Sequence, residues 1–280
     1  MKFREVMDLY ANRNNPAWVR LAPRSKAIYS VGMKHLKRFY DVDVDKITRP
    51  MIVEWRDDYY DYPGRLRPAL NVLNNILNYA HDHGWVEYNQ AARLRGLPGT
   101  KPHARWDDER FETFIANVPQ RIRLAMMLAL YTGQRRVDLV NMKWEDYDGE
   151  YISVWQQKTS IRLSVPVHKR LKAELDQTKR VGKTILVNSF GQRWNPDSLN
   201  RAIKMELNRL GMSVGVGQNN DQPLRLHGLR KSAAAKLAEA GCTPHQIAAI
   251  TGHKSLKQVE HYTNEANQKR LATEAIAKWI

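Results

Sequence analysis

The sequence predicts a mostly α-helical protein of two domains, with one small β-hairpin in the second domain. Apolar residues recur at helical spacing along most of the chain, and strict alternation of apolar and polar residues occurs only within 151–167. Residues 96–104 (GLPGTKPHA) hold two Gly and two Pro and have no apolar period, as is typical of a linker. We therefore expect a helical domain at 1–95, a linker at 96–104 and a larger domain at 105–280.

The first domain is expected to contain four helices. After a short helix at 2–11, residues 24–40 place Ile28, Val31, Leu36 and Phe39 on one face and basic residues on the other, which predicts a basic amphipathic helix. Thr48, followed by Arg49-Pro50, has the pattern of an N-cap and opens a helix to about residue 60. Pro63-Gly64 is expected to break the chain. Leucines at helical spacing then predict a helix over 65–82 that stops near His83-Gly84.

The second domain is expected to open with two helices and then change its period. Residues 107–116 and 119–132 have helical patterns, and the second contains the dense apolar run IRLAMMLALYT, which should be buried. The alternating segments YISVW and IRLSVPV flank QQKTS and predict a two-stranded hairpin. From residue 196 the pattern is helical to the end, except over 211–222.

The charge balance favours a polyanionic partner. The chain has 45 Lys and Arg against 29 Asp and Glu, a formal net charge of +16, and both predicted domains are net basic. Nucleic acid is therefore the first candidate. Cys242 is the single cysteine, which excludes an intrachain disulfide and a Cys-rich zinc site. No signal peptide or membrane-spanning stretch is evident, so we expect a cytoplasmic protein without a membrane partner.

Four short clusters carry residue types suited to phosphate chemistry. They are TGQRRVDL at 132–139 with Arg135 and Asp138, QQKTS with Lys158 at the hairpin tip, HGLR with His227 and Arg230, and TGHKSLKQVEHYT with His253 and Tyr262. Each cluster alone has an ordinary structural explanation: a solvated Arg pair, a turn Lys, a surface His and Arg, or a packing Tyr.

Taken together and in this order, the four clusters resemble the tyrosine recombinases of the phage integrase family. The nine-residue spacing from His253 to Tyr262 is that of the family. The resemblance covers about 105–270, and residues 76–91 (ILNYAHDHGWVEYNQA) resemble part of the family's helical core-binding domain. The fold that this resemblance implies is a two-domain DNA clamp, with a helical core-binding domain and an α+β catalytic domain.

The resemblance also implies a role for each site residue. Arg135 and Arg230 would grip the scissile phosphate, because a guanidinium fork matches two non-bridging oxygens and stays charged. Tyr262 would attack that phosphate and form a 3′-phosphotyrosyl link, so that rejoining needs no ATP. Lys158 would protonate the 5′-oxygen that leaves. In the same way, His227 would assist proton transfer and His253 would hydrogen-bond the phosphate.

Three positions depart from the family's usual pattern. Asp138 stands where Glu is more common at the position that supports the Arg and His groups, while Gln134 and Thr251 replace usually apolar residues. We expect neither Gln134 nor Thr251 to touch the catalytic set. The chemistry implied needs no metal or cofactor, and the sequence shows no clustered carboxylates.

The expected role is that of an integrase of a prophage or genomic island. A Xer-type resolvase of chromosome or plasmid dimers and a relaxing topoisomerase remain alternatives within the family. From other classes, residues 242–262 can pass for the helix-turn-helix of a non-enzymatic DNA-binding regulator, and a metal-dependent nuclease would require grouped Asp or Glu.

Residues 265–280 predict a C-terminal helix with a narrow apolar stripe formed by Leu271, Ala275, Ile276 and Trp279. We expect this helix to pack on a neighbouring protomer in a homotetramer on DNA, and the alternative is that it folds back on its own domain. DNA-bending accessory proteins are further candidate partners. The sequence begins in what resembles the core-binding domain, so a separate arm-binding domain is expected to be absent or not included.

Overall fold

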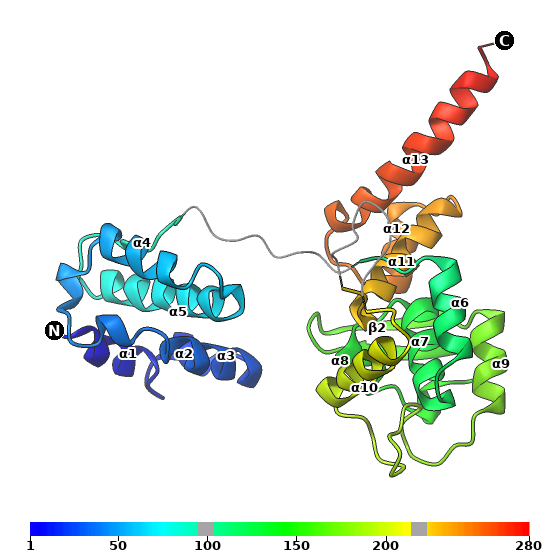
Figure 1. Ribbon diagram of the computed structural model, residues 1–280, viewed down its shortest axis with the longest axis horizontal. Helices are drawn as coiled ribbons and strands as arrows, with labels where there is room; N and C mark the ends of the chain where they lie inside the picture. Colours follow the sequence, from blue (N-terminus) through cyan, green and yellow to red (C-terminus); the bar gives the residue numbers. More distant parts are fainter. Residues whose placement is uncertain (95–103, 214–222, 280) are drawn as a thin grey trace. The chain divides into compact units, whose positions relative to one another are not determined.

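The computed structural model describes residues 1–94, 104–213 and 223–279, apart from the side chains at 261, 265–267 and 269–271. The chain divides into two compact units, Met1–Thr100 and Lys101–Ile280 (Figure 1). The predicted linker lies outside the described residues except for Ala104, which is buried in the core of the second unit. Most of the predicted break at 211–222 lies outside them as well.

The described part of the first unit is helical throughout. Its core packs α3 and α1 against α5, with Phe39 in edge-on contact with both Phe3 and Trp55 at ring distances of 6.0 and 5.7 Å. Short 3-10 turns occur at Lys37–Phe39 and Val44–Lys46. The helices are α1 (Phe3–Tyr10), α2 (Pro16–Val19), α3 (Pro23–Met33), α4 (Arg49–Asp58) and α5 (Pro63–Asp82).

The amphipathic helix predicted at 24–40 is wrong in its length and in its buried face. α3 ends at Met33, and Ile28 and Val31 are exposed. The face that packs on α5 is centred on Gly32, where an added Cβ would lie 2.7 Å from the carbonyl oxygen of Pro68. The absence of a side chain therefore allows a close helix–helix approach that hydrophobic periodicity does not reveal.

The helix starts also differ in detail from the expectation. Pro63-Gly64 was expected to break the chain but forms the first turn of α5. Proline is tolerated there because a backbone N–H in the first turn of a helix has no partner within the helix. Thr48 precedes α4 as predicted, but its side chain makes no capping hydrogen bond.

The second unit surrounds α7, which is buried along most of its length, as its apolar run predicts. Helices α6, α9 and α11 pack against it. Helix α9 has no counterpart in the sequence-based expectation. The helices are α6 (Asp108–Ala116), α7 (Gln120–Thr132), α8 (Arg136–Leu139), α9 (Lys169–Gln177), α10 (Pro196–Arg209), α11 (Leu226–Glu239), α12 (Pro244–Thr251) and α13 (Lys257–Ala277), with a 3-10 turn at Trp144–Asp146.

The predicted hairpin is present as two antiparallel strands, β1 (Tyr151–Gln156) and β2 (Ile161–Pro166). Ile152, Val154 and Gln156 face inward and are buried, whereas Tyr151 and Trp155 are exposed. The described fold is therefore mostly α-helical with one small β-sheet, and the predicted fold class is confirmed. No helix in the described ranges is both long and apolar enough to cross a membrane.

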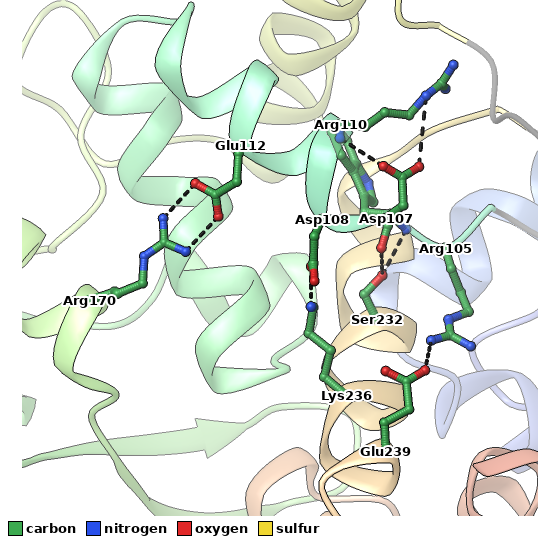
Figure 2. A network of polar contacts seen from close by, with 10 residues as sticks. Arg105, Asp107, Asp108, Arg110, Glu112, Arg170, Ser232, Lys236 and Glu239 are labelled. Atoms are coloured by element: carbon green, nitrogen blue, oxygen red, sulfur yellow. Dashed lines mark hydrogen bonds and ion pairs between the residues drawn. The ribbon is translucent and has the colours of Figure 1, made fainter. Parts of the chain in front are cut away.

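Helix α11 is anchored by the segment that enters the second unit (Figure 2). The Ser232 hydroxyl accepts a hydrogen bond from the Trp106 backbone N–H at 2.8 Å and lies 3.0 Å from the Trp106 carbonyl oxygen. Arg105 pairs with Glu239 at 2.7 Å, and Lys236 pairs with Asp108. These contacts fix α11, which carries two of the predicted site residues.

Candidate active site

Two helices end in the same way and lie close together at the candidate site. Helix α7 ends in Thr132-Gly133 and α12 ends in Thr251-Gly252, and each glycine has a left-handed backbone, with φ of +62° and +69°. A Cβ added to Gly133 would lie 2.9 Å from the Cγ2 of Thr251. The TGQR and TGH clusters, far apart in sequence, are thereby brought side by side.

Arg230 joins these two helix ends. Its side chain is only 4% exposed, and its Nη1 donates to the carbonyl oxygen of Gly133 at 2.8 Å and to that of Thr251 at 2.5 Å. The carbonyls at a helix C-terminus carry partial negative charge and stabilise a cation. Its Nη2 is buried and has no hydrogen-bond partner among the described residues. The guanidinium is held from one side and retains donors for a further ligand.

Arg135 is held by a pair of buried glutamines, Gln134 and Gln156, which we call the glutamine relay. Arg135 Nη1 donates to Gln156 Oε1 at 2.7 Å, and Gln156 Nε2 donates to Gln134 Oε1 at 2.6 Å and to the Thr251 carbonyl oxygen at 2.8 Å. Gln134 Nε2 donates to the Ile250 carbonyl oxygen at 2.8 Å. The relay ties Arg135 to the hairpin and to the end of α12.

The expectation that Thr251 does not touch the catalytic set is wrong, because its carbonyl accepts from Arg230 and its hydroxyl contacts His253. Gln134 acts on the set indirectly, through Gln156, which is the partner of Arg135. Sequence reasoning also missed Gln156. A signal was present, because Gln156 occupies the inward-facing position that follows Ile152 and Val154 in the alternation of β1.

Asp138 supports the hairpin rather than hydrogen-bonding an arginine. It is 2% exposed, and its Oδ1 accepts from the backbone N–H of Gln157 at 3.1 Å. Burial raises the pKa of Asp138, against the opposing effects of that N–H and of Arg135 and Arg230. Its Oδ2 is buried with no hydrogen-bond partner in the described part of the chain.

The site is strongly cationic. Burial, and then the neighbouring Arg135, lower the pKa of Arg230 to about 10, so that the guanidinium still carries its charge at neutral pH. The buried guanidinium of Arg230 and the partly buried one of Arg135 repel each other, and Asp138 offsets this repulsion only in part. An anionic ligand would relieve the repulsion and accept the remaining hydrogen bonds.

The two histidines differ in their surroundings. His227 is exposed in the first turn of α11, one turn before Arg230. His253 follows Gly252, and its Nδ1 lies 2.6 Å from the Thr251 hydroxyl oxygen. Burial and the charges of Arg230 and Arg135 lower the pKa of His253 to about 4, with a smaller contribution from His227. His253 is therefore neutral near pH 7.

Tyr262 lies half-buried on α13, against the small core that α11 and α12 form with Val259. Burial raises the pKa of Tyr262, and the positive charges of Arg105 and Arg230 act in the opposite direction. Arg105 was not identified from the sequence, where it follows the predicted linker without any motif. The structure thus brings Tyr262 into the electrostatic field of Arg230.

Lys158 lies apart from this cluster. It is exposed in the turn between β1 and β2, and no described contact joins its side chain to the arginines. A lysine at a hairpin tip can reach a ligand that extends along the surface. No group of three or more His, Cys, Asp or Glu side chains in the described ranges is arranged to hold a metal ion.

Arg230 is buried, Arg135 is partly buried, and the charge of Arg230 acts on Tyr262, so the site combines cationic groups suited to a phosphate with a tyrosine. Residues 106–269 match the phage integrase family, and this match covers more than half of the chain. The chain therefore belongs to the phage integrase family and is a tyrosine site-specific recombinase. The resemblance seen in the sequence is confirmed.

Similar proteins agree with this assignment. The integrase of Escherichia phage lambda is 26% identical over 243 residues, which cover 82% of this chain and 67% of that protein. A lambda integrase dimer bound to a COC′ core site is similar in structure, with a TM-score of 0.79, 23% identity and coverage of 94% of this chain and 77% of that chain. A lambda integrase tetramer bound to a Holliday junction has a TM-score of 0.76 at 24% identity, covering 91% and 78%. None of these findings supports a helix-turn-helix regulator or a metal-dependent nuclease.

Proposed function

We propose that this recombinase integrates a mobile genetic element by cutting and rejoining double-stranded DNA through a covalent link between Tyr262 and a 3′-phosphate. The observation that carries the residue assignment is Arg230, which is buried and held by two carbonyls on Nη1, with no described partner for Nη2. Such a group is costly to bury unless a ligand completes its hydrogen bonds.

The arginines would bind the non-bridging oxygens of the scissile phosphate. Arg230 and Arg135 are fixed before the ligand arrives, by the helix-end carbonyls and the glutamine relay respectively. Donors held in place in a buried site stabilise the negative charge that develops in the transition state without a reorganisation cost. The same arrangement would serve cleavage and rejoining, because both pass through the same transition state.

Two proton transfers would accompany the attack. The Tyr262 oxygen forms a bond to phosphorus as the bond from phosphorus to the 5′-oxygen breaks, which conserves the phosphodiester energy. Because burial raises the pKa of Tyr262, its hydroxyl starts protonated. His227, in the first turn of α11, would assist removal of that proton. Lys158 at the hairpin tip would donate a proton to the 5′-oxygen.

A nicked suicide substrate tests the nucleophile. Wild-type protein should accumulate a protease-sensitive covalent protein–DNA adduct, and Tyr262→Phe should bind the half-site with unchanged affinity but form no adduct. Tyr131→Phe is the matched control, because Tyr131 is also a partly buried tyrosine of the second unit but stacks on His168. Adduct formation by Tyr262→Phe would refute the assignment.

We further propose that the first unit is the core-binding domain and that both units hold the duplex. Residues 1–100 carry 16 basic and 11 acidic groups, and residues 101–280 carry 29 and 18, so both units are net basic. Contacts from many Lys and Arg residues to phosphate would make the affinity strongly dependent on salt. DNA-bending accessory proteins remain an expectation that follows from the family alone.

The C-terminal helix is proposed to join protomers in a tetramer. The side chains at 272–279, at the end of α13 and just beyond it, are exposed, including Ile276 at 62% and Trp279 at 84%. Figure 1 shows the end of α13 projecting from the rest of the second unit. The described residues therefore favour packing on a second copy over folding back. A candidate acceptor is an apolar pocket of about 450 Å³ whose lining includes Leu130, Tyr131, Leu237 and Ile250.

A further inference from the structure

The hydroxyl of Thr251 makes two hydrogen bonds that together determine where a proton lies. Thr251 is fully buried at the end of α12, and its Oγ1 lies 2.7 Å from the Ile247 carbonyl oxygen and 2.6 Å from His253 Nδ1. A carbonyl oxygen can only accept, so the single hydroxyl proton is donated to Ile247. The proton in the second bond must then belong to Nδ1 of His253.

We propose that Thr251 is a positioning residue that holds His253 as the Nδ1–H tautomer and thereby commits Nε2 to the substrate phosphate. The inference rests on the proposed function, together with the role that the family resemblance implies for His253, a hydrogen bond to that phosphate. A neutral imidazole carries one proton, so Nε2 is a bare acceptor when Nδ1 is protonated. Since a phosphodiester oxygen has no proton to give, His253 must gain a proton on Nε2 to donate to it.

The charges around His253 make this proton uptake depend on the substrate. The groups that act on it are Arg230 and His227 of α11 and Arg135 from the segment before α8, and all are cationic or able to become so. Together with burial they hold the pKa of His253 at about 4 in the free protein. A bound phosphodiester places a negative charge among the same groups and raises that pKa. DNA binding is therefore coupled to protonation of His253.

Nitrogen-15 NMR of the full chain, labelled at histidine, tests the tautomer without DNA. At pH 7 the His253 signals should show a protonated Nδ1 and an unprotonated Nε2. Thr251→Val should remove the preference for Nδ1–H, and Thr251→Ser, which keeps the hydroxyl, should retain it. A wild-type ring protonated on Nε2, or an unchanged tautomer in Thr251→Val, would overturn the proposal. The wild-type spectrum alone tests the predicted tautomer, even if the valine variant does not fold.

Thr132→Val is the matched control. Thr132 is 1% exposed and ends α7 just before Gly133, and its hydroxyl donates to the Leu128 carbonyl oxygen at 2.6 Å. Its hydroxyl therefore makes the same helix-end hydrogen bond as that of Thr251, without a described contact to a histidine. Thr132→Val should leave the His253 tautomer as in the wild type. If Thr132→Val changed the His253 tautomer as much as Thr251→Val does, the loss of any helix-end hydroxyl would have this effect. That result would overturn the specific role of Thr251.

Proton uptake and cleavage test the link to the substrate. Calorimetry of half-site binding, in buffers of different ionisation enthalpy, measures the number of protons taken up. The wild type should take up more protons than Thr251→Val, because the neutral His253 ring of this variant can present Nε2–H. Adduct formation at neutral pH should slow by about ten-fold in Thr251→Val, as for loss of one oriented hydrogen bond. Equal uptake and equal rates would refute the positioning role. Failure of the proposed function would appear separately, as an adduct formed by Tyr262→Phe.

Discussion

At the scale of single residues, Arg135 is held by a buried glutamine whose amide oxygen and nitrogen both have hydrogen-bond partners. Gln156 has no exposed surface, and its amide donates to Gln134 and to the Thr251 carbonyl while accepting from Arg135 and from Thr159. A buried polar network of this kind specifies one geometry, because the loss of one member leaves the others without partners. The relay therefore holds Arg135 without a carboxylate that would compete for its charge.

Gln156→Leu should disrupt this relay, and Gln157→Leu is the matched control. Gln156 is buried and its neighbour Gln157 is exposed on the same strand end, so the two changes remove the same group from opposite environments. We expect Gln156→Leu to lower the free energy of unfolding by about 1–3 kcal/mol and to slow adduct formation. Gln157→Leu should change stability by less than about 0.5 kcal/mol. Denaturant titration and the suicide-substrate assay measure both effects, and equal effects of the two changes would contradict the relay.

At the scale of secondary-structure elements, the ends of α7 and α12 position two of the proposed site residues, Arg135 and His253. Each helix stops at a glycine in the left-handed conformation, so the chain turns sharply and the next residues enter the site. Helix α11 passes beside both ends and contributes Arg230, and its own position is fixed by the contacts drawn in Figure 2. Two helix ends and the neighbouring helix α11 thus hold the arginines of the proposed site.

Gly252→Ala should be more harmful than Gly241→Ala, although both glycines follow helices with positive φ. An added Cβ at Gly252 would lie 2.3 Å from Gln156 Nε2, whereas nothing lies within 4 Å of one at Gly241. Gly241→Ala should therefore lower the free energy of unfolding by only about 1 kcal/mol, the strain of a left-handed alanine. Gly252→Ala should lower the free energy of unfolding further and should also slow DNA cleavage, because the added methyl group displaces Gln156 of the glutamine relay. Thermal unfolding and adduct formation give the comparison, and the same loss in both variants would argue against tight packing at Gly252.

At the scale of the whole molecule, assembly is proposed to govern activity through α13. This helix carries both Tyr262 and the exposed Ile276, and Trp279 follows two residues after its end, so the proposed contact between protomers would be joined to the proposed nucleophile by one helix. Docking of the helix end on a second copy would therefore position the tyrosine. Burying a tryptophan together with Ile276 contributes roughly 3–5 kcal/mol, which is sufficient once DNA holds the protomers close together.

Deletion of residues 271–280 should leave half-site binding by a monomer nearly unchanged and abolish the four-protomer complex on paired sites. Trp279→Ala should also weaken the complex, and Lys278→Ala, a change at the exposed neighbouring residue, should not. Native gels and light scattering report the assembly, and circular dichroism confirms that the variants are folded. A folded deletion variant that assembles normally would contradict the trans packing of α13.

The sequence alone determined the fold class and the order of the candidate site residues. Helical periods, the alternation of β1 and β2, and the His253–Tyr262 spacing are local patterns, and local patterns follow from the hydrogen-bonding geometry of the backbone. The buried run of α7 was predicted for the same reason. The amphipathic reading of α3 failed because a close approach at Gly32, and not the apolar residues Ile28 and Val31, decides which face is buried.

Only the tertiary structure decided how the site residues are held. Gln156 meets Arg135 across 21 positions of sequence and Thr251 across 95, and Arg230 meets Gly133 across 97. No local pattern encodes such contacts, since they depend on where two helix ends and a hairpin come together. For this reason Gln134 and Thr251 seemed unconnected to the catalytic set in the sequence. In the folded protein they support its arginines, and Thr251 contacts His253, because a buried polar group must be paired with whatever the fold places beside it.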